Sequence, residues 1–142
     1  MKINDIMTHR ASYVGAHVTL AEAARIMRMD GVIYLPVCER QRVIGCVTDR
    51  DIVIRGLAEG YNPAETAVRS VMSSDVLTVY MDEDTRDVAR LMERKLLRRL
   101  PVLNRNDRLV GVVSDGDVAR GNFRLSGETF PGELGDALAN AV

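Results

Sequence analysis

The sequence predicts a mixed α/β fold of the α+β type, in which two βαββα repeats pack with pseudo-twofold symmetry. Three observations lead to this prediction. The chain of 142 residues repeats its own pattern once, and both copies show the same order of strand and helix signals. A copy of about 60 residues is also too short to bury a good core alone, so the two copies should pack on each other.

The repeat is visible when the chain is aligned with itself. Met7 corresponds to Met72, at a spacing of 65 residues (72 − 7). One extra residue in the last turn of the second copy then changes the spacing to 66, so that Gly45 corresponds to Gly111 (111 − 45). We divide the chain on this basis into repeat 1 (1–60), repeat 2 (61–121) and a C-terminal extension (122–142). Within the extension, Pro131 to Ala141 is compatible with a short helix.

Each copy opens with a short β-branched strand, at Ser12–Val14 or Leu77–Val79. A helix with apolar residues at helical spacing follows, and it is predicted to begin just after a capping residue that has an acidic residue three positions later. The two capping pairs are Thr19 with Glu22 and Asp84 with Asp87.

The second part of each copy contains two apolar runs separated by a polar turn. The first run begins near Pro36 or Pro101, and the turns are at 39–42 and 104–108. We expect the first two strands of a copy to be parallel through a right-handed crossover, because a helix connects them. The last two strands should form a hairpin, and a second helix should follow.

Composition narrows the possible functions. The 19 basic and 20 acidic residues leave a net charge of −1, which gives no long-range field for nucleic acid or an anionic membrane surface. No secretory signal and no membrane-length apolar segment is visible, so we expect a cytoplasmic protein. Cys38 and Cys46 lie in apolar stretches and are predicted to be free, with a disulfide as the less favoured alternative.

The sequence shows no arrangement of residues that is typical of an enzyme active site. The two histidines, His9 and His17, have no counterparts in the second copy. The sequence contains no zinc-binding spacing of Cys and His and no glycine-rich phosphate loop. We therefore expect no catalytic activity, no metal site and no required cofactor.

The ends of the two copies resemble a known signature. Gly45–Ile52 (GCVTDRDI) and Gly111–Val118 (GVVSDGDV) are similar to the signature of cystathionine-β-synthase (CBS) domains. Each is preceded by the Leu-Pro-Val and Met-Thr/Ser elements of that family, and the resemblance covers roughly residues 2–121. Two such domains in tandem are called a Bateman module. The resemblance implies that adenosine-containing ligands bind in clefts between the copies.

The matched residues are suited to a phosphate and a ribose. Thr48 and Ser114 stand where a strand ends and a helix begins, so their hydroxyls and the free backbone N–H groups can hold an anion. Asp51 and Asp117, three residues later, offer paired acceptors for two ribose hydroxyls. The alternative is that each pair only caps the following helix, as such residues do in many proteins.

Other candidate residues follow from the same resemblance. Arg50 adds a guanidinium to the first signature, whereas the second has Gly116, so the two sites should be unequal. Arg98 and Arg99 are candidates to bring positive charge to one cleft, and Tyr34 is a candidate to stack on an adenine. Ordinary packing or a solvated basic surface is the alternative for each. The proposed base pockets group Thr8 with Leu35 and Pro36, and Ser73 with Leu100 and Pro101.

Together these observations predict a stand-alone regulatory protein that binds an adenine nucleotide or another adenosyl ligand between its repeats. AMP, ADP, ATP and S-adenosylmethionine are the candidate ligands. The resemblance also implies a homodimer, and the signal should pass through self-association or an unknown protein effector. The alternative is a structural or protein-interaction module that keeps the CBS fold without binding a ligand.

Overall fold

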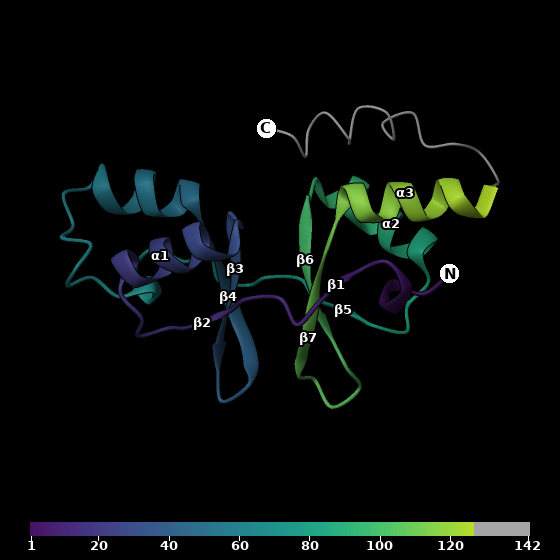
Figure 1. Ribbon diagram of the computed structural model, residues 1–142, viewed down its shortest axis with the longest axis horizontal. Coiled ribbons are helices and arrows are strands. Elements are labelled where there is room, and N and C mark those ends of the chain that lie inside the picture. Colours follow the sequence, from purple (N-terminus) through teal and green to yellow (C-terminus); the bar gives the residue numbers. More distant parts are fainter. Residues whose placement is uncertain (127–142) are drawn as a thin grey trace.

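Two small β-sheets lie side by side at the centre of the computed structural model, which describes residues 1–126 (Figure 1). The first sheet has the strand order β2-β3-β4, formed by Val14–Gly15, Tyr34–Glu39 and Arg42–Thr48. The second has the order β1-β7-β6-β5, formed by Thr8–His9, Leu109–Ser114, Arg99–Leu103 and Val79–Tyr80. Each sheet belongs to one half of the molecule.

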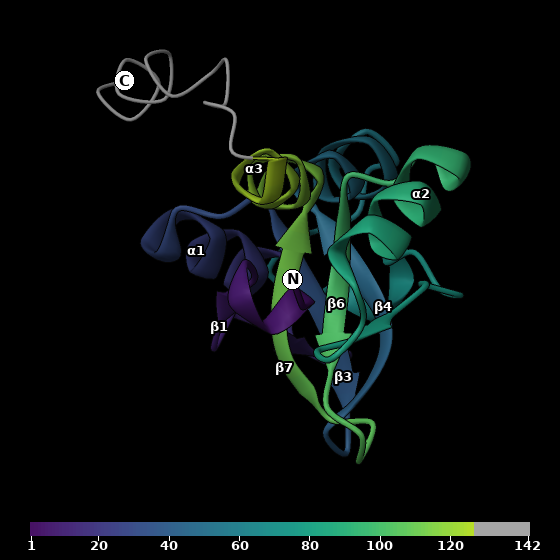
Figure 2. The ribbon, with the colours of Figure 1, turned by 90° about the vertical axis from the view of Figure 1, so that its right-hand side faces the viewer.

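Helices cover the sheets on the outer side of each half (Figures 1 and 2). The first half carries α1 (Leu20–Asp30) and a π-helical segment, η2 (Asp51–Leu57). The second half carries α2 (Thr85–Lys95) and α3 (Asp115–Ser126). Two short 3₁₀ segments, η1 (Ile3–Asp5) and η3 (Val68–Ser70), complete the described elements.

The predicted element order is confirmed in both copies. The strand pairs β2/β3 and β5/β6 are parallel, whereas β3/β4 and β6/β7 form antiparallel hairpins. The side chain of Thr19 accepts a hydrogen bond from the backbone N–H of Glu22 at the start of α1. Asp84 also caps α2, but it accepts from the backbone N–H of Arg86, two residues later, rather than from that of Asp87. The opening strands differ slightly from the prediction, because they begin at Val14 and Val79 rather than two residues earlier.

The opening segment of each copy packs into the other half. Ile3 and Met7 are buried in the core around α2, β6 and β7, although they precede the first copy's own strands. Val68 and Val71, from the opening of the second copy, are buried in the core around α1, β3 and β4. Figure 1 shows the chain starting beside the second half and then crossing to the first. The repeat boundaries in the sequence therefore do not separate the two hydrophobic cores.

Backbone pairing reinforces this exchange. β1 lies antiparallel to β7, with Thr8 opposite Val112. The equivalent segment of the second copy forms an isolated antiparallel bridge, in which Cys46 and Ser73 exchange backbone hydrogen bonds of 3.0 and 2.9 Å. Each half thus gains an edge contact from the other copy, which explains how two short repeats form one stable molecule.

Two further points concern helices. Within residues 1–126, no helix is long and apolar enough to cross a membrane. α3 continues through Ser126, beyond the predicted end of repeat 2 at residue 121. The helix predicted at 131–141 lies outside the described residues.

Candidate functional site

Two clefts open where the halves meet. The first, which we call the Ser114 cleft, has a volume of about 600 Å³. The second, which we call the Thr48 cleft, has a volume of about 480 Å³. Each is lined by residues from both copies. The volumes are in the range of small-molecule sites in proteins.

The two clefts are built largely from equivalent positions of the two copies, although Asp117 lines the Ser114 cleft whereas its counterpart Asp51 lies outside both sets of lining residues. The Ser114 cleft combines Ser114 and Asp117 of the second signature with Thr8 from the opening of the first copy. The Thr48 cleft combines Thr48 of the first signature with Ser73 from the opening of the second copy. Each signature is therefore completed by the exchanged opening segment. The expected grouping of Thr8 with Leu35 and Pro36 is replaced by a grouping across the copies.

Both signatures form the reciprocal contacts of a capping box. The backbone N–H of Thr48 donates to Asp51 at 3.0 Å, and the backbone N–H of Asp51 donates to the Thr48 hydroxyl at 3.1 Å. Ser114 and Asp117 make the same pair of bonds, both at 3.0 Å. The helix-capping alternative is therefore realised in both copies. Asp117 also accepts from Arg120 at 2.9 Å, so its carboxylate is held in place at the wall of the Ser114 cleft.

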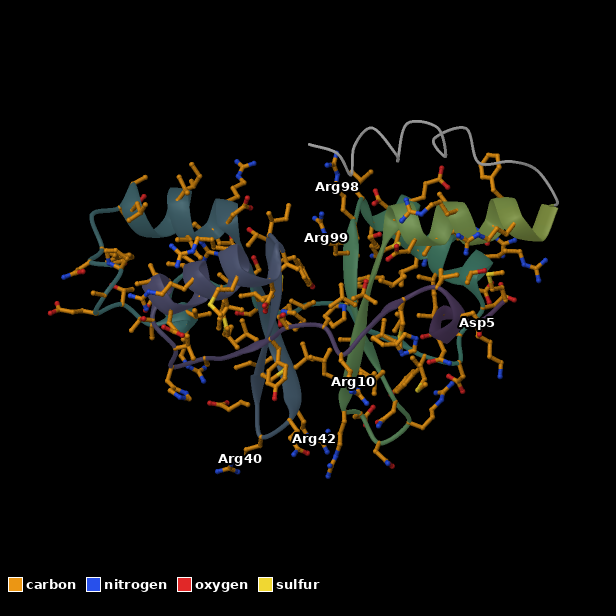
Figure 3. The ribbon with its side chains drawn as sticks, viewed as in Figure 1. Asp5, Arg10, Arg40, Arg42, Arg98 and Arg99 are labelled. Carbon is orange, nitrogen blue, oxygen red and sulfur yellow. The ribbon has the colours of Figure 1, made fainter. Side chains whose placement is uncertain are left out.

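The charges around the two clefts differ. The Ser114 cleft is lined by two arginines and two aspartates, namely Arg10, Arg99, Asp30 and Asp117. The Thr48 cleft is lined by three cationic residues and one aspartate, namely Lys95, Arg98, Arg99 and Asp75. Figure 3 shows Arg98 and Arg99 at the upper end of β6, with Arg10 lower in the same view. An anionic ligand is therefore favoured more by the Thr48 cleft.

Within residues 1–126, Tyr34 and Arg99 are the two residues that line both clefts. The hydroxyl of Tyr34 is buried and makes no hydrogen bond of standard geometry among the described residues, and the Cys46 thiol beside it is at most a weak partner. Burial, together with the Cys46 thiol beside it, raises the pKa of Tyr34 well above its usual range. The side chain therefore presents a neutral phenol between the two clefts, and its polar atom is available to a ligand.

Replacing Tyr34 with phenylalanine is expected to raise the free energy of unfolding of the ligand-free protein by about 1 kcal/mol. The reason is that a buried hydroxyl without a strong partner costs about 1–3 kcal/mol, and the Cys46 thiol is only a weak one, whereas phenylalanine removes the hydroxyl without changing the ring. Urea unfolding at neutral pH measures the change. A loss of stability of similar size would mean that the hydroxyl has a strong partner in solution.

The remaining candidates fall into two groups. Leu35, Pro36 and Pro101 are buried strand residues and, within the described part of the chain, line neither cleft. Leu100 is also buried, but it contributes to the wall of the Thr48 cleft. Arg50 is exposed beside the first signature, and neither set of lining residues includes it. The difference in charge between the two clefts therefore does not come from Arg50 and Gly116 but from other positions.

Sequence reasoning missed the charged residues that the opening segments bring to the clefts. Arg10 lines the Ser114 cleft, and its counterpart Asp75 lines the Thr48 cleft. Asp30 and its counterpart Lys95, at the ends of α1 and α2, are reversed in charge in the same way. The repeat alignment contains this signal, since opposite charges stand at equivalent positions. Only the exchange of segments shows that these positions face the clefts.

The thiols and the potential metal ligands are unremarkable chemically. Cys38 and Cys46 are both free. Burial raises the pKa of Cys38 to about 11 and also raises that of Cys46, so both are neutral thiols at physiological pH. No group of three or more His, Cys, Asp or Glu side chains gathers within the described residues.

Comparison with known proteins identifies the relatives of this architecture. A family model described as "CBS domain" matches residues 3–57 and 68–122. Hypoxic response protein 1 of Mycobacterium tuberculosis is 38% identical over 117 residues, which cover 82% of this chain and 81% of that protein. A crystal structure of Hypoxic Response Protein I with two coordinated zinc ions has a TM-score of 0.76 and 36% identity, and the match covers 84% of this chain and 98% of that one.

A second solved structure is similar over most of the chain. It is the CBS domain pair of protein MJ0100 in complex with 5′-methylthioadenosine and S-adenosyl-L-methionine. Its TM-score is 0.71, its sequence is 25% identical, and the match covers 89% of this chain and 96% of that one. The fold of this chain is therefore similar to those of both solved structures.

Proposed function

The chain belongs to the CBS-domain family, and from this membership we propose that it is a regulatory protein that binds an adenosyl ligand in the clefts between its two repeats. The observation that carries the proposal is the pairing of each signature hydroxyl with a hydroxyl from the opposite copy, Thr48 with Ser73 and Ser114 with Thr8. The complex of the MJ0100 CBS domain pair with two adenosyl compounds supports this ligand class.

In the proposed complex, the ribose hydroxyls lie against the signature aspartates, and the phosphate or its equivalent lies near the helix that follows. The capping contacts do not oppose this role. A carboxylate has two oxygens that can each accept more than one hydrogen bond, so Asp117 is able to cap its helix and accept from a ribose. Tyr34 supplies an aromatic ring and a hydroxyl without a strong partner in the described structure, at the place where both clefts meet.

We propose that the ligand acts by favouring one arrangement of the two halves or of two chains. A ligand shifts such an equilibrium only as far as its affinities for the two states differ. Large apolar side chains on the helices, or directly after one in the case of Leu96, are available for contact with a second copy or an effector. Leu96, Met29 and Leu57 are 89, 76 and 50% exposed, respectively. A homodimer formed through the helices fits this distribution, and a protein effector is the other route for the signal.

A structural module without a ligand is the second candidate. The capping bonds of Thr48 with Asp51, and of Ser114 with Asp117, favour it, because they give the signature residues a role in stability alone. The two candidates make different predictions for the same variant, in which both aspartates are replaced by alanine.

The expected result is a selective rise in melting temperature when the protein is mixed with AMP, ADP, ATP or S-adenosylmethionine, with guanine nucleotides as controls. A ligand at 100 times its Kd adds about 2.7 kcal/mol to the stability of the folded state, which corresponds to a shift of several degrees. Differential scanning fluorimetry measures it. If none of the adenosyl compounds shifts the transition, the structural module is the better description.

Asp51→Ala combined with Asp117→Ala is expected to abolish the ligand-induced shift and to lower the basal stability by about 1 kcal/mol per lost cap. Thr19→Ala is the matched control, since Thr19 caps α1 through Glu22 and belongs to neither signature. It should lose similar stability and keep the full shift. A double variant that keeps its ligand response places the site elsewhere.

A further inference from the structure

Arg99 occupies a special place between the two clefts. It lines both of them, as does Tyr34, and these two residues are counterparts at the spacing of 65 residues (99 − 34). Each stands at the start of the first hairpin strand of its copy, β6 for Arg99 and β3 for Tyr34. The pseudo-twofold relation therefore places one aromatic ring and one guanidinium at the junction of the clefts.

The guanidinium of Arg99 is available to a ligand. Among the described residues, no ion pair and no side-chain hydrogen bond of Arg99 is formed. Its charge acts on the neighbouring Tyr34, whose pKa it tends to lower against the larger effect of burial. Figure 3 shows Arg99 beside Arg98 at the upper end of β6. The residue is half-buried, so a contact with an anion there is partly shielded from water.

We propose that Arg99 couples the two clefts, so that anionic adenosyl ligands bind antagonistically while uncharged ones bind independently. This inference rests on the proposed adenosyl site. A guanidinium that forms a bidentate contact with one phosphate directs its fork to that cleft and leaves the other without it. Repulsion between two bound anions near the junction acts in the same direction.

The charges also set the order of binding. The Thr48 cleft has Arg98 and Lys95 in addition to Arg99, and only Asp75 opposes them. In the Ser114 cleft, Arg10 is balanced by two aspartates. The first anion therefore enters the Thr48 cleft and takes Arg99 with it. The protein then has one occupied cleft over a wide range of nucleotide concentration, and the second fills only when the concentration is much higher.

The test measures how tightly AMP binds in the Ser114 cleft under two conditions. In the first, a larger side chain fills the Thr48 cleft, and in the second, AMP already occupies it. Cys46→Phe fills the Thr48 cleft, and Val112→Phe at the equivalent position fills the Ser114 cleft. Isothermal titration calorimetry with AMP should give a second binding constant in the unmodified protein that is about tenfold weaker than the constant of Cys46→Phe, the size expected for a lost charged contact. Ser74→Trp, at an exposed position of the same cleft, replaces Cys46→Phe if that variant does not fold.

Arg99→Gln provides the direct control. It should weaken AMP binding about tenfold in the Cys46→Phe background, and it should leave the second AMP constant of the otherwise unmodified protein unchanged. 5′-Methylthioadenosine, which is uncharged, should bind in the Ser114 cleft with the same affinity in Cys46→Phe and in the unmodified protein. Equal or tighter binding of the second AMP overturns the coupling. Absence of binding by both compounds overturns the proposed adenosyl site itself, so the two failures are distinguishable.

Discussion

Replacing Ile3 with alanine is expected to lower the free energy of unfolding by about 3 kcal/mol, which is a large effect for the third residue of a chain. Ile3 is 0% exposed and lies in the core formed by α2, β6 and β7. Terminal residues usually tolerate substitution because they are poorly ordered. Here the side chain completes the core of the second repeat, so its removal leaves a cavity.

Urea unfolding measures this loss, and two further variants interpret it. Val68→Ala is the equivalent change in the other half, since Val68 is also 0% exposed and lies in the core around α1. It should destabilise the protein by about 1–3 kcal/mol, less than Ile3→Ala because fewer carbon atoms are removed. Met29→Ala, at a side chain that is 76% exposed, should change stability by less than about 0.5 kcal/mol. An Ile3→Ala variant as stable as Met29→Ala would show that the opening segment is not docked in solution.

Replacing Gly111 with alanine is expected to destabilise the protein by about 2–3 kcal/mol, the range of overpacked sites. A Cβ atom at this position would overlap the carbonyl oxygen of Thr8, which belongs to the rigid backbone of the exchanged opening segment. The segment must move away, and the pairing of β1 with β7 is then disturbed. The same variant should weaken ligand binding in the Ser114 cleft, since Thr8 lines it.

Gly45→Ala tests the same principle in the other half, where the added Cβ would lie 2.5 Å from the carbonyl oxygen of Ser73. Gly116→Ala is the matched control within the second signature. The nearest atom to a Cβ added at residue 116, leaving aside the adjacent residues, is at the end of the flexible Arg120 side chain, 3.3 Å away. Because alanine favours the helix that contains residue 116, this variant should be neutral or stabilised by up to about 1 kcal/mol. Thermal unfolding of the three variants side by side checks the order, and equal stability of all three would contradict the close approach.

Much of the local structure was predictable from sequence. The capping residues Thr19 and Asp84, the parallel and antiparallel strand pairs, and the start of the last helix at the second signature are all observed. These features depend on residues close together in the chain, and their patterns are repeated in the second copy. The limits of the opening strands were less predictable, because two-residue strands carry little periodicity.

The candidate site was predictable in part. The hydroxyls Thr48, Ser114, Thr8 and Ser73 do line the clefts, as does Tyr34. Their grouping was not predictable, since it depends on which half each opening segment joins. Pro36 and Pro101 were expected beside the base but are buried in strands. Each proline stands two residues after a cleft residue, Tyr34 or Arg99, on the same face of its strand. The apolar pattern around these prolines therefore gives no sign that tertiary packing buries them.

By itself, the sequence determined the two repeats, the order of their elements, and the hydroxyl and carboxylate pairs of the two signatures, because each of these depends on neighbouring residues and local hydrogen bonds. The tertiary structure alone decided that the opening segments cross to the opposite halves and that Tyr34 and Arg99 stand between both clefts. The physical reason is that a repeat of this size buries too little apolar surface alone. Its stability comes from side chains such as Ile3 and Val68, and no local pattern states which core they will fill.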